Sequence, residues 1–202
     1  MPQSIPPDQH PVRSRSGFDL RDLISERYWP ALAAGALMLV VGLTAYFTNQ
    51  PFLYPSLGPT AFLQAEFPFH RSSRFRDTTI GHLIGVISGL VSVFFLGAGG
   101  EPRLGSGAHM PPLRIGAAAL TMTLVILLEI VFKVSNPPSA STGLLFALGY
   151  FQPTIRDVSE VLAGVLFLAS FGALIRHIRS LSPAKWESID PATTGISENG
   201  QQ

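Results

Sequence analysis

The sequence has 202 residues, of which 47% are hydrophobic and only 13% are charged, and its net charge is +1. Because soluble domains carry about 25% charged residues, this composition excludes an ordinary soluble domain and indicates an integral membrane protein. The near-neutral charge argues against a nucleic-acid partner, which would require a basic surface. The absence of cysteine excludes disulfides and thiol chemistry.

We predict a membrane domain at residues 28–178, with a polar segment before it and another after it in the sequence. Residues 1–27 are predicted to be disordered or interfacial. Residues 1–17 are rich in Pro, Ser and Arg and are predicted to be disordered. Residues 18–27 fit either a short interfacial helix or a linker. Because this stretch is too long for the n-region of a cleavable signal, we expect the first apolar run to remain as an anchor. Residues 179–202 are expected to form a polar tail.

Four apolar runs approach the ~20 residues that a helix needs to cross a hydrocarbon core of ~30 Å. We predict spans at residues 28–47, 78–96, 113–134 and 158–175. The second span has Gly81, Gly85 and Gly89 on one face, a spacing that is typical of closely packed membrane helices. The Gly- and Pro-rich residues 97–112 predict an exposed loop.

Two proline-containing segments interrupt this pattern, YPSLGPTAF at residues 54–62 and SNPPSASTG at residues 135–143. Proline removes a backbone donor and cannot lie inside an unbroken helix. We therefore predict two broken elements, at residues 49–69 and 136–153, each with a short helix after its prolines. The predicted fold class is all-α, with four full transmembrane helices plus two half helices.

The two parts of the chain, residues 28–97 and 113–178, share one order of elements: long span, proline break, short apolar helix, polar joint, long span. If both broken elements cross the membrane, every Lys and Arg except Arg103, Arg114 and Arg156 lies on the side of the amino terminus. The positive-inside rule favours this arrangement. We therefore predict six crossings that form an inverted internal repeat, with the amino terminus in the cytoplasm.

Inverted repeats with discontinuous helices are typical of transporters, whose binding site lies at the midplane where the breaks meet. The start of a short helix presents backbone N–H groups and the positive end of its dipole, so two facing starts form a cradle for a small anion. Hydroxyl groups add donors, and glycines let a ligand approach the backbone. The predicted binding residues are Ser56, Gly58, Thr60, Asn136, Ser139, Ser141, Thr142 and Gly143. The alternative for each hydroxyl is that it only caps a short helix.

His82, Glu129 and Lys133 are predicted as coupling or gating candidates, because ionisable groups in membrane segments are commonly functional. Histidine ordinarily titrates near neutral pH, so His82 is a candidate for proton coupling. Its alternative role is an interhelical hydrogen bond. Glu129 and Lys133 stand at i and i+4, and in the alternative interpretation they neutralise each other at the interface.

Motifs that indicate enzymes are missing from the sequence. It has no HExxH, GxSxG, P-loop or CxxC pattern. We therefore expect a protein without enzymatic activity, and we predict neither a metal site nor another cofactor.

Three motifs resemble the HPP family of integral membrane proteins: Pro55-x-x-Gly58-x-x-Ala61, Arg76-Asp77-x-x-x-Gly81-His82-x-x-Gly85, and Asn136-Pro137-Pro138-x-x-Ser141-Thr142-x-x-Leu145. The resemblance covers residues 28–178. The family is named for a His-Pro-Pro motif, in which Asn136 here replaces the histidine, and its glycine pair before the second-span histidine is here Ile80-Gly81. Plant plastid and cyanobacterial members are associated with nitrite transport, and some bacterial members carry CBS domains, which this sequence lacks. The resemblance implies membrane transport of a small anion such as nitrite.

The prediction is therefore a transporter or channel for a small, nitrite-like anion, bound between two half-helix amino termini at the membrane midplane. The expected partners are the lipid bilayer and the anion, with homo-oligomerisation left open, and the expected location is the plasma (inner) membrane. One alternative is a non-transporting membrane scaffold or sensor module. Another is a cation- or proton-coupled pathway that uses Glu129. If Glu129 points into the cavity between the breaks without pairing with Lys133, the anion interpretation weakens.

Overall fold

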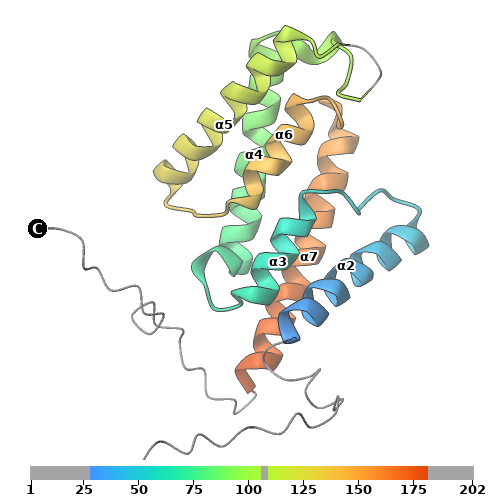
Figure 1. Cartoon of the computed structure of the whole chain (residues 1–202), viewed down its shortest axis with the longest axis vertical. Coiled ribbons are helices and arrows are strands. Elements are labelled where there is room, and N and C mark those ends of the chain that lie inside the picture. Colours follow the sequence, from blue (N-terminus) through green and yellow to red (C-terminus); the bar gives the residue numbers. More distant parts are fainter. Residues whose placement is uncertain (1–27, 106–108, 182–202) are drawn as a thin grey trace, which may run out of the picture.

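The computed structural model describes residues 28–105 and 109–181, which form helices and loops without any strand (Figure 1). Four helices are long and apolar enough to cross a membrane. They are α2 (Trp29–Thr48), α4 (Phe75–Phe95), α5 (Pro112–Phe132) and α7 (Ile155–Leu181). Two short helices, α3 (Leu57–Glu66) and α6 (Pro138–Ala147), follow the proline breaks, and the 3₁₀ turns η1 (Arg71–Ser73) and η2 (Ala98–Gly100) flank α4.

The predicted all-α fold, with four spans and two half helices, is confirmed within these residues. The predictions for residues 1–27, including the interfacial helix at 18–27, concern residues outside the described part. The same holds for the tail beyond residue 181.

The long helices that precede the breaks, α2 and α5, end in the same way. Asn49 follows α2 and Lys133 follows α5, and both have a left-handed backbone, with φ of 53° and 52°. Asparagine tolerates this conformation, whereas it is uncommon for lysine. Prolines follow at Pro51 and Pro137, and they prevent α2 and α5 from continuing as unbroken helices. Each break therefore consists of a residue with a left-handed backbone, which ends the long helix, and a proline that follows it in the sequence.

Contacts between distant segments define one end of the molecule, which we call the basic end and which lies at the bottom of Figure 1. Here the Arg179 guanidinium lies 5.4 Å from the ring centroid of Trp29. Arg176 Nη1 donates a hydrogen bond to the Ser73 carbonyl at 3.4 Å. The starts of α2 and α4 and the end of α7 thus lie together.

The opposite end brings together η2, the start of α5 and the end of α6. Arg114 Nη2 donates to the Glu101 carbonyl at 2.9 Å, and the Leu104 amide donates to the Leu148 carbonyl at 3.0 Å. Consequently α4 runs away from the basic end and α7 runs toward it, as the two upright helices of Figure 1 show. The short helices point in opposite directions, α3 toward the basic end and α6 away from it.

The short helix α6 packs closely on α4 through the glycine face of α4. A Cβ added at Gly85 would collide with the Ser139 carbonyl oxygen, and one added at Gly89 would lie 2.6 Å from the Gly143 carbonyl oxygen. Side chains at these positions would therefore hold the two helices apart. The predicted packing face is confirmed, and its partner is the second broken element.

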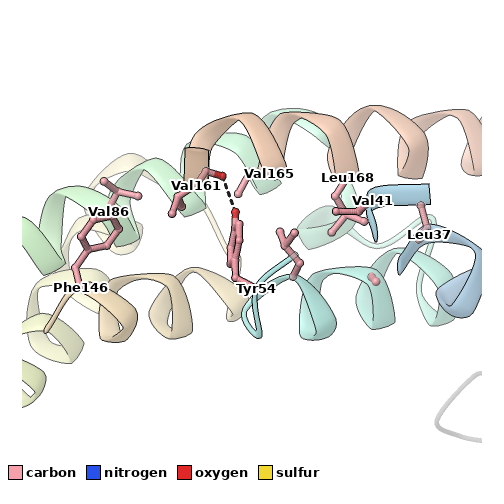
Figure 2. Close-up of a cluster of buried hydrophobic side chains, with 10 residues drawn as sticks. Leu37, Val41, Tyr54, Val86, Phe146, Val161, Val165 and Leu168 are labelled. Atoms are coloured by element: carbon pink, nitrogen blue, oxygen red, sulfur yellow. Dashed lines mark hydrogen bonds between the residues drawn. The ribbon is translucent and has the colours of Figure 1, made fainter. Parts of the chain in front are cut away.

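The other short helix, α3, packs on α7. The Tyr54 hydroxyl, just before α3, donates to the Val161 carbonyl at 2.5 Å. Gly164 leaves room for the preceding loop, since an added Cβ would lie 3.0 Å from the Phe52 carbonyl oxygen. Figure 2 shows the apolar cluster around this contact. Its members are Leu37, Val41, Tyr54, Leu57, Ala61, Val86, Phe146, Val161, Val165 and Leu168. Each half thus supplies a long helix that packs on the other half's short helix, while each short helix also packs on the long helix before it.

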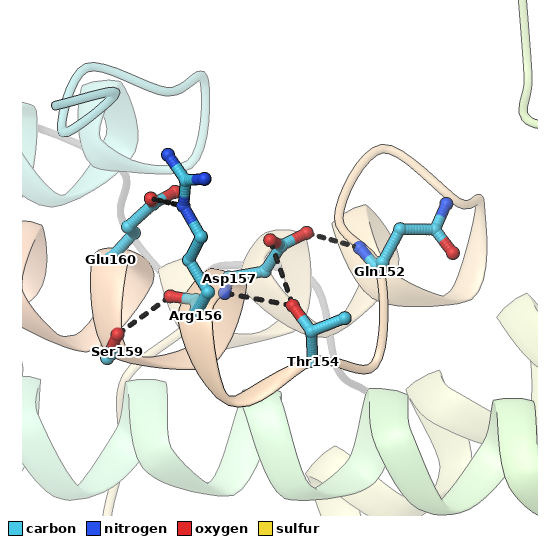
Figure 3. A network of polar contacts seen from close by, with 6 residues as sticks. All are labelled: Gln152, Thr154, Arg156, Asp157, Ser159 and Glu160. Carbon is cyan, nitrogen blue, oxygen red and sulfur yellow. Dashed lines mark hydrogen bonds and ion pairs between the residues drawn. The ribbon is translucent and has the colours of Figure 1, made fainter.

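The helix α7 is longer than the predicted span at residues 158–175. It starts earlier because Thr154 and Asp157 form a capping box (Figure 3). The Asp157 amide donates to Thr154 Oγ1 at 3.2 Å, and Asp157 Oδ2 accepts from the Gln152 amide at 2.6 Å. On the next turn, Arg156 Nε donates to Glu160 Oε1 at 2.8 Å. At its other end the helix continues past Arg176 and Arg179 to Leu181.

Candidate functional site

A buried hydrogen-bonded cluster joins the two breaks, and we call it the histidine cluster. His82 Nε2 lies 2.9 Å from Thr60 Oγ1 on α3, and His82 Nδ1 lies 2.7 Å from Thr142 Oγ1 on α6. Thr142 Oγ1 is also 2.9 Å from Ser56 Oγ, at the start of α3. All four residues are buried. The start of α3 therefore meets the middle of α6 through hydroxyl groups, with the α4 imidazole between them.

The directions of these hydrogen bonds follow from one fixed acceptor. Thr60 Oγ1 donates to the Ser56 carbonyl oxygen at 3.2 Å, which can only accept. Thr60 therefore accepts from Nε2–H of His82. With a neutral ring, Nδ1 then accepts from Thr142, and the Thr142 oxygen accepts from Ser56. A neutral imidazole thus satisfies every group of the histidine cluster. The predicted interhelical hydrogen bond of His82 is present.

Glu129, near the end of α5, turns toward the start of α6. Ser139 Oγ donates to Glu129 Oε1 at 2.7 Å, and Ser139 is fully buried. Within the described residues, Glu129 forms no ion pair with Lys133. Lys133 instead takes the left-handed position after α5, and its carbonyl accepts from Arg71. The interpretation that Glu129 and Lys133 neutralise each other is therefore wrong, because the helix ends before their side chains can pair.

The hydroxyl groups do not cap the short helices, since neither α3 nor α6 has a side-chain cap at its start. The first backbone N–H groups bond to carbonyls of the preceding turn instead. Gly58 N donates to the Pro55 carbonyl at 3.2 Å, and Ser139 N donates to the Asn136 carbonyl at 2.9 Å. The positive ends of the helix dipoles and the hydroxyl donors would therefore stabilise an anion at these starts, because the backbone N–H groups of Gly58 and Ser139 already have partners.

The remaining predicted binding residues have different surroundings. Asn136 is fully buried and its Nδ2 donates to the Thr78 carbonyl at 3.2 Å, while its Oδ1 has no partner. Ser141 Oγ donates to the carbonyl of Pro138, within its own helix. No protein atom lies within 4 Å of a Cβ added at Gly58.

Gly143 differs from Gly58, because protein atoms already fill the space beside it. A Cβ added there would lie 2.7 Å from Thr121 Cγ2 and 2.8 Å from the Gly85 carbonyl oxygen. The absence of a side chain at Gly143 therefore serves the contact of α6 with α4 and α5.

Sequence reasoning missed Gln64, which lies on α3 and is 1% exposed. Neither Oε1 nor Nε2 of its amide has a hydrogen-bond partner, and the amide lies against Gly172 of α7. Ser56, Thr60 and Gln64 follow one another at four-residue spacing, which places polar groups on one face of α3. That spacing is the sequence signal that indicates a polar stripe extending from the histidine cluster toward the basic end.

Comparison with known proteins agrees with the motifs. The family described as HPP, transmembrane region, matches residues 20–183, which is most of the chain. Neither a curated protein nor a solved structure matches the sequence. The family match includes all four membrane-spanning helices, both short helices and the histidine cluster. The chain therefore belongs to the HPP transmembrane family of integral membrane proteins.

Proposed function

We propose that this membrane protein transports a small oxyanion of the nitrite class, which binds between the starts of α3 and α6. The observation that carries the proposal is the hydrogen bond of 2.7 Å from Ser139 to the Glu129 carboxylate. A carboxylate is itself a small planar oxyanion, and here it lies at the first turn of a ten-residue helix. The positive end of a helix dipole stabilises such a charge. Glu129 thus represents the ligand that the site would take.

Transport requires a route past this internal carboxylate. A second anion at the start of α6 would be repelled by Glu129 in a low-dielectric environment. Binding of the substrate therefore requires Glu129 to take up a proton or to withdraw from Ser139. In the first case, one proton accompanies each anion. The proposed mechanism is thus proton-coupled anion transport, in which Glu129 and the substrate alternate at Ser139.

The arrangement of the ends supports six crossings related as an inverted repeat. The short helices α3 and α6 point in opposite directions, and each begins after a residue with a left-handed backbone. Arg71, Arg74 and Arg76 then share the basic end with Arg176 and Arg179. By the positive-inside rule this end is cytoplasmic. Such repeats place substrate sites where discontinuous helices meet.

A second candidate is a proton or cation pathway, and the orientation of Glu129 favours it. The carboxylate points to the second break and has no ion pair with Lys133 among the described residues. In that mechanism the carboxylate binds the transported cation directly. The two candidates therefore differ in what neutralising Glu129 does.

Uptake into proteoliposomes tests the proposal, with nitrite, nitrate and formate supplied with and without an inwardly directed proton gradient. We expect the wild type to take up nitrite faster with the gradient. Glu129→Gln should still take up nitrite but lose the response to the gradient. Glu66→Gln is the matched control, because Glu66 is an exposed carboxylate at the end of α3, and it should behave like the wild type.

Two other outcomes of the uptake experiment would contradict anion transport. Proton or sodium flux without anion uptake, abolished in Glu129→Gln, would establish the cation pathway. Protein that inserts and folds but moves none of these ions would support the scaffold or sensor alternative.

A further inference from the structure

Two adjoining hollows lie at the basic end, between the start of α4 and the end of α7. One has a volume of about 470 Å³ and is lined by Phe69, Arg74, Phe75, Arg76 and Arg176. The other has a volume of about 460 Å³ and shares Phe69 and Arg176 with the first. We call the combined surface the arginine groove. Its volume falls within the range of about 300–1,000 Å³ that is usual for ligand sites.

The charge of the arginine groove is one-sided. Arg74 and Arg76 are exposed, and Arg176 uses Nη1 for the Ser73 carbonyl. None of these three forms an ion pair within the described residues, and no carboxylate lines either hollow. Arginine is well suited to phosphate, because its planar guanidinium presents paired donors.

The apolar part of the groove matches the position of the membrane. Phe69 and Phe75 are 48% and 39% exposed, although both lie beside a helix long enough to span the bilayer. The apolar stretch of α7 ends at Ile175, directly before Arg176 and His177. The groove therefore lies where hydrocarbon meets headgroups, with rings for acyl chains and guanidinium groups for phosphate.

We propose that the arginine groove binds the phosphodiester headgroup of an anionic membrane phospholipid. A soluble phosphate would use the arginines but not the exposed phenylalanine rings. The cytoplasmic leaflet is rich in anionic lipids, and each Lys or Arg near its surface strengthens the attraction. The proposal is independent of the transported ion, since the groove lies outside the histidine cluster and away from Glu129.

Native mass spectrometry of the purified full chain tests this, with phosphatidylglycerol and phosphatidylcholine of the same acyl chains in competition. We expect the wild type to retain phosphatidylglycerol in preference to phosphatidylcholine. The double variant Arg74→Gln/Arg76→Gln should lower that preference by about 30-fold, which follows from about fivefold per arginine. Arg103→Gln/Arg156→Gln removes the same charge from the opposite end and should keep the preference.

Three results would overturn the assignment. Equal retention of the two lipids by the wild type would show that the groove does not select a charged headgroup. An equal loss in both double variants would show that net charge, and not this groove, attracts the lipid. If inorganic phosphate abolishes the retention of phosphatidylglycerol by the wild type, but does not change retention by the Arg74→Gln/Arg76→Gln variant, the groove binds a soluble anion.

Discussion

The two breaks have matching sequences but different surroundings. The start of α6 is enclosed: Asn136 is buried against Gly81, and the Ser139 carbonyl lies on Gly85. The start of α3 is open on one side, since nothing lies within 4 Å of a Cβ added at Gly58. The difference shows that similar proline breaks need not have similar roles.

The enclosed start of α6 holds an internal carboxylate, whereas no protein atom covers Gly58 at the start of α3. We infer that α6 is the fixed part of the site and that a ligand enters beside α3. The histidine cluster links them, because His82 bonds to Thr60 on one side and Thr142 on the other. The predictions below separate these roles, from the largest expected effect to the smallest.

Gly85→Leu should cause the largest loss, because it places a side chain against the Ser139 carbonyl and lifts α6 from α4. Overpacking typically costs about 1–3 kcal/mol, and we expect the upper end of that range where a backbone oxygen blocks the side chain. The melting temperature in detergent measures the effect. Gly35→Leu is the control, since nothing lies within 4 Å of its added Cβ. Equal melting temperatures for the two variants would show that α6 is not seated on Gly85.

His82→Leu should cut the link between the breaks. It leaves the buried Thr60 and Thr142 hydroxyls without the imidazole, and unsatisfied buried groups cost about 1–3 kcal/mol each. We expect the lower end, because Thr60 keeps the Ser56 carbonyl as a partner. Thermal unfolding again reports the loss, with the exposed His109→Leu as control. An unchanged melting temperature for His82→Leu would mean that the cluster does not hold the short helices together.

Asn136→Ala should destabilise the enclosed start by about 1 kcal/mol, the usual net contribution of one neutral hydrogen bond. The lost bond is the one from Nδ2 to the Thr78 carbonyl. Ser135→Ala, an exposed neighbour, should have no measurable effect on thermal unfolding. A loss several times larger would indicate that the unpaired Oδ1 of Asn136 has a partner that the side-chain hydrogen bonds do not show.

Gly58→Leu should have the smallest effect on stability, within about 0.5 kcal/mol, because the new side chain meets no protein atom. It should nevertheless slow anion uptake strongly, since it fills the space beside the open start of α3. Gly100→Leu, which also has open space around its added Cβ, should leave both properties unchanged. Uptake by Gly58→Leu at the wild-type rate would contradict entry beside α3.

The fold was largely predictable because membrane spans depend on local composition. The hydropathy pattern located all four spans, and the prolines located both breaks. The early start of α7 was also encoded locally, in the Thr154 and Asp157 capping box, but those residues lie outside the apolar run. Periodicity of hydrophobic residues does not detect such a polar start.

The site was predictable as a set of residues but not as a set of contacts. The sequence places Glu129 and Lys133 one turn apart, which suggests an ion pair. Their true partners depend on where α5 stops and on where the chain returns after the break. The same holds for Gly143, whose neighbours belong to α4 and α5 and are distant in sequence.

The exchange of partners between the halves has a consequence for synthesis. Besides α2, α3 packs on α7, and Tyr54 reaches its carbonyl acceptor only when Val161 has been made. Until then, the first break would expose unpaired backbone N–H and C=O groups to lipid, which costs free energy because lipid offers no hydrogen-bond partner. We therefore expect α3 to settle in the membrane late, after the last span has left the ribosome, so that a nascent chain truncated before α7 stays bound to the insertion machinery.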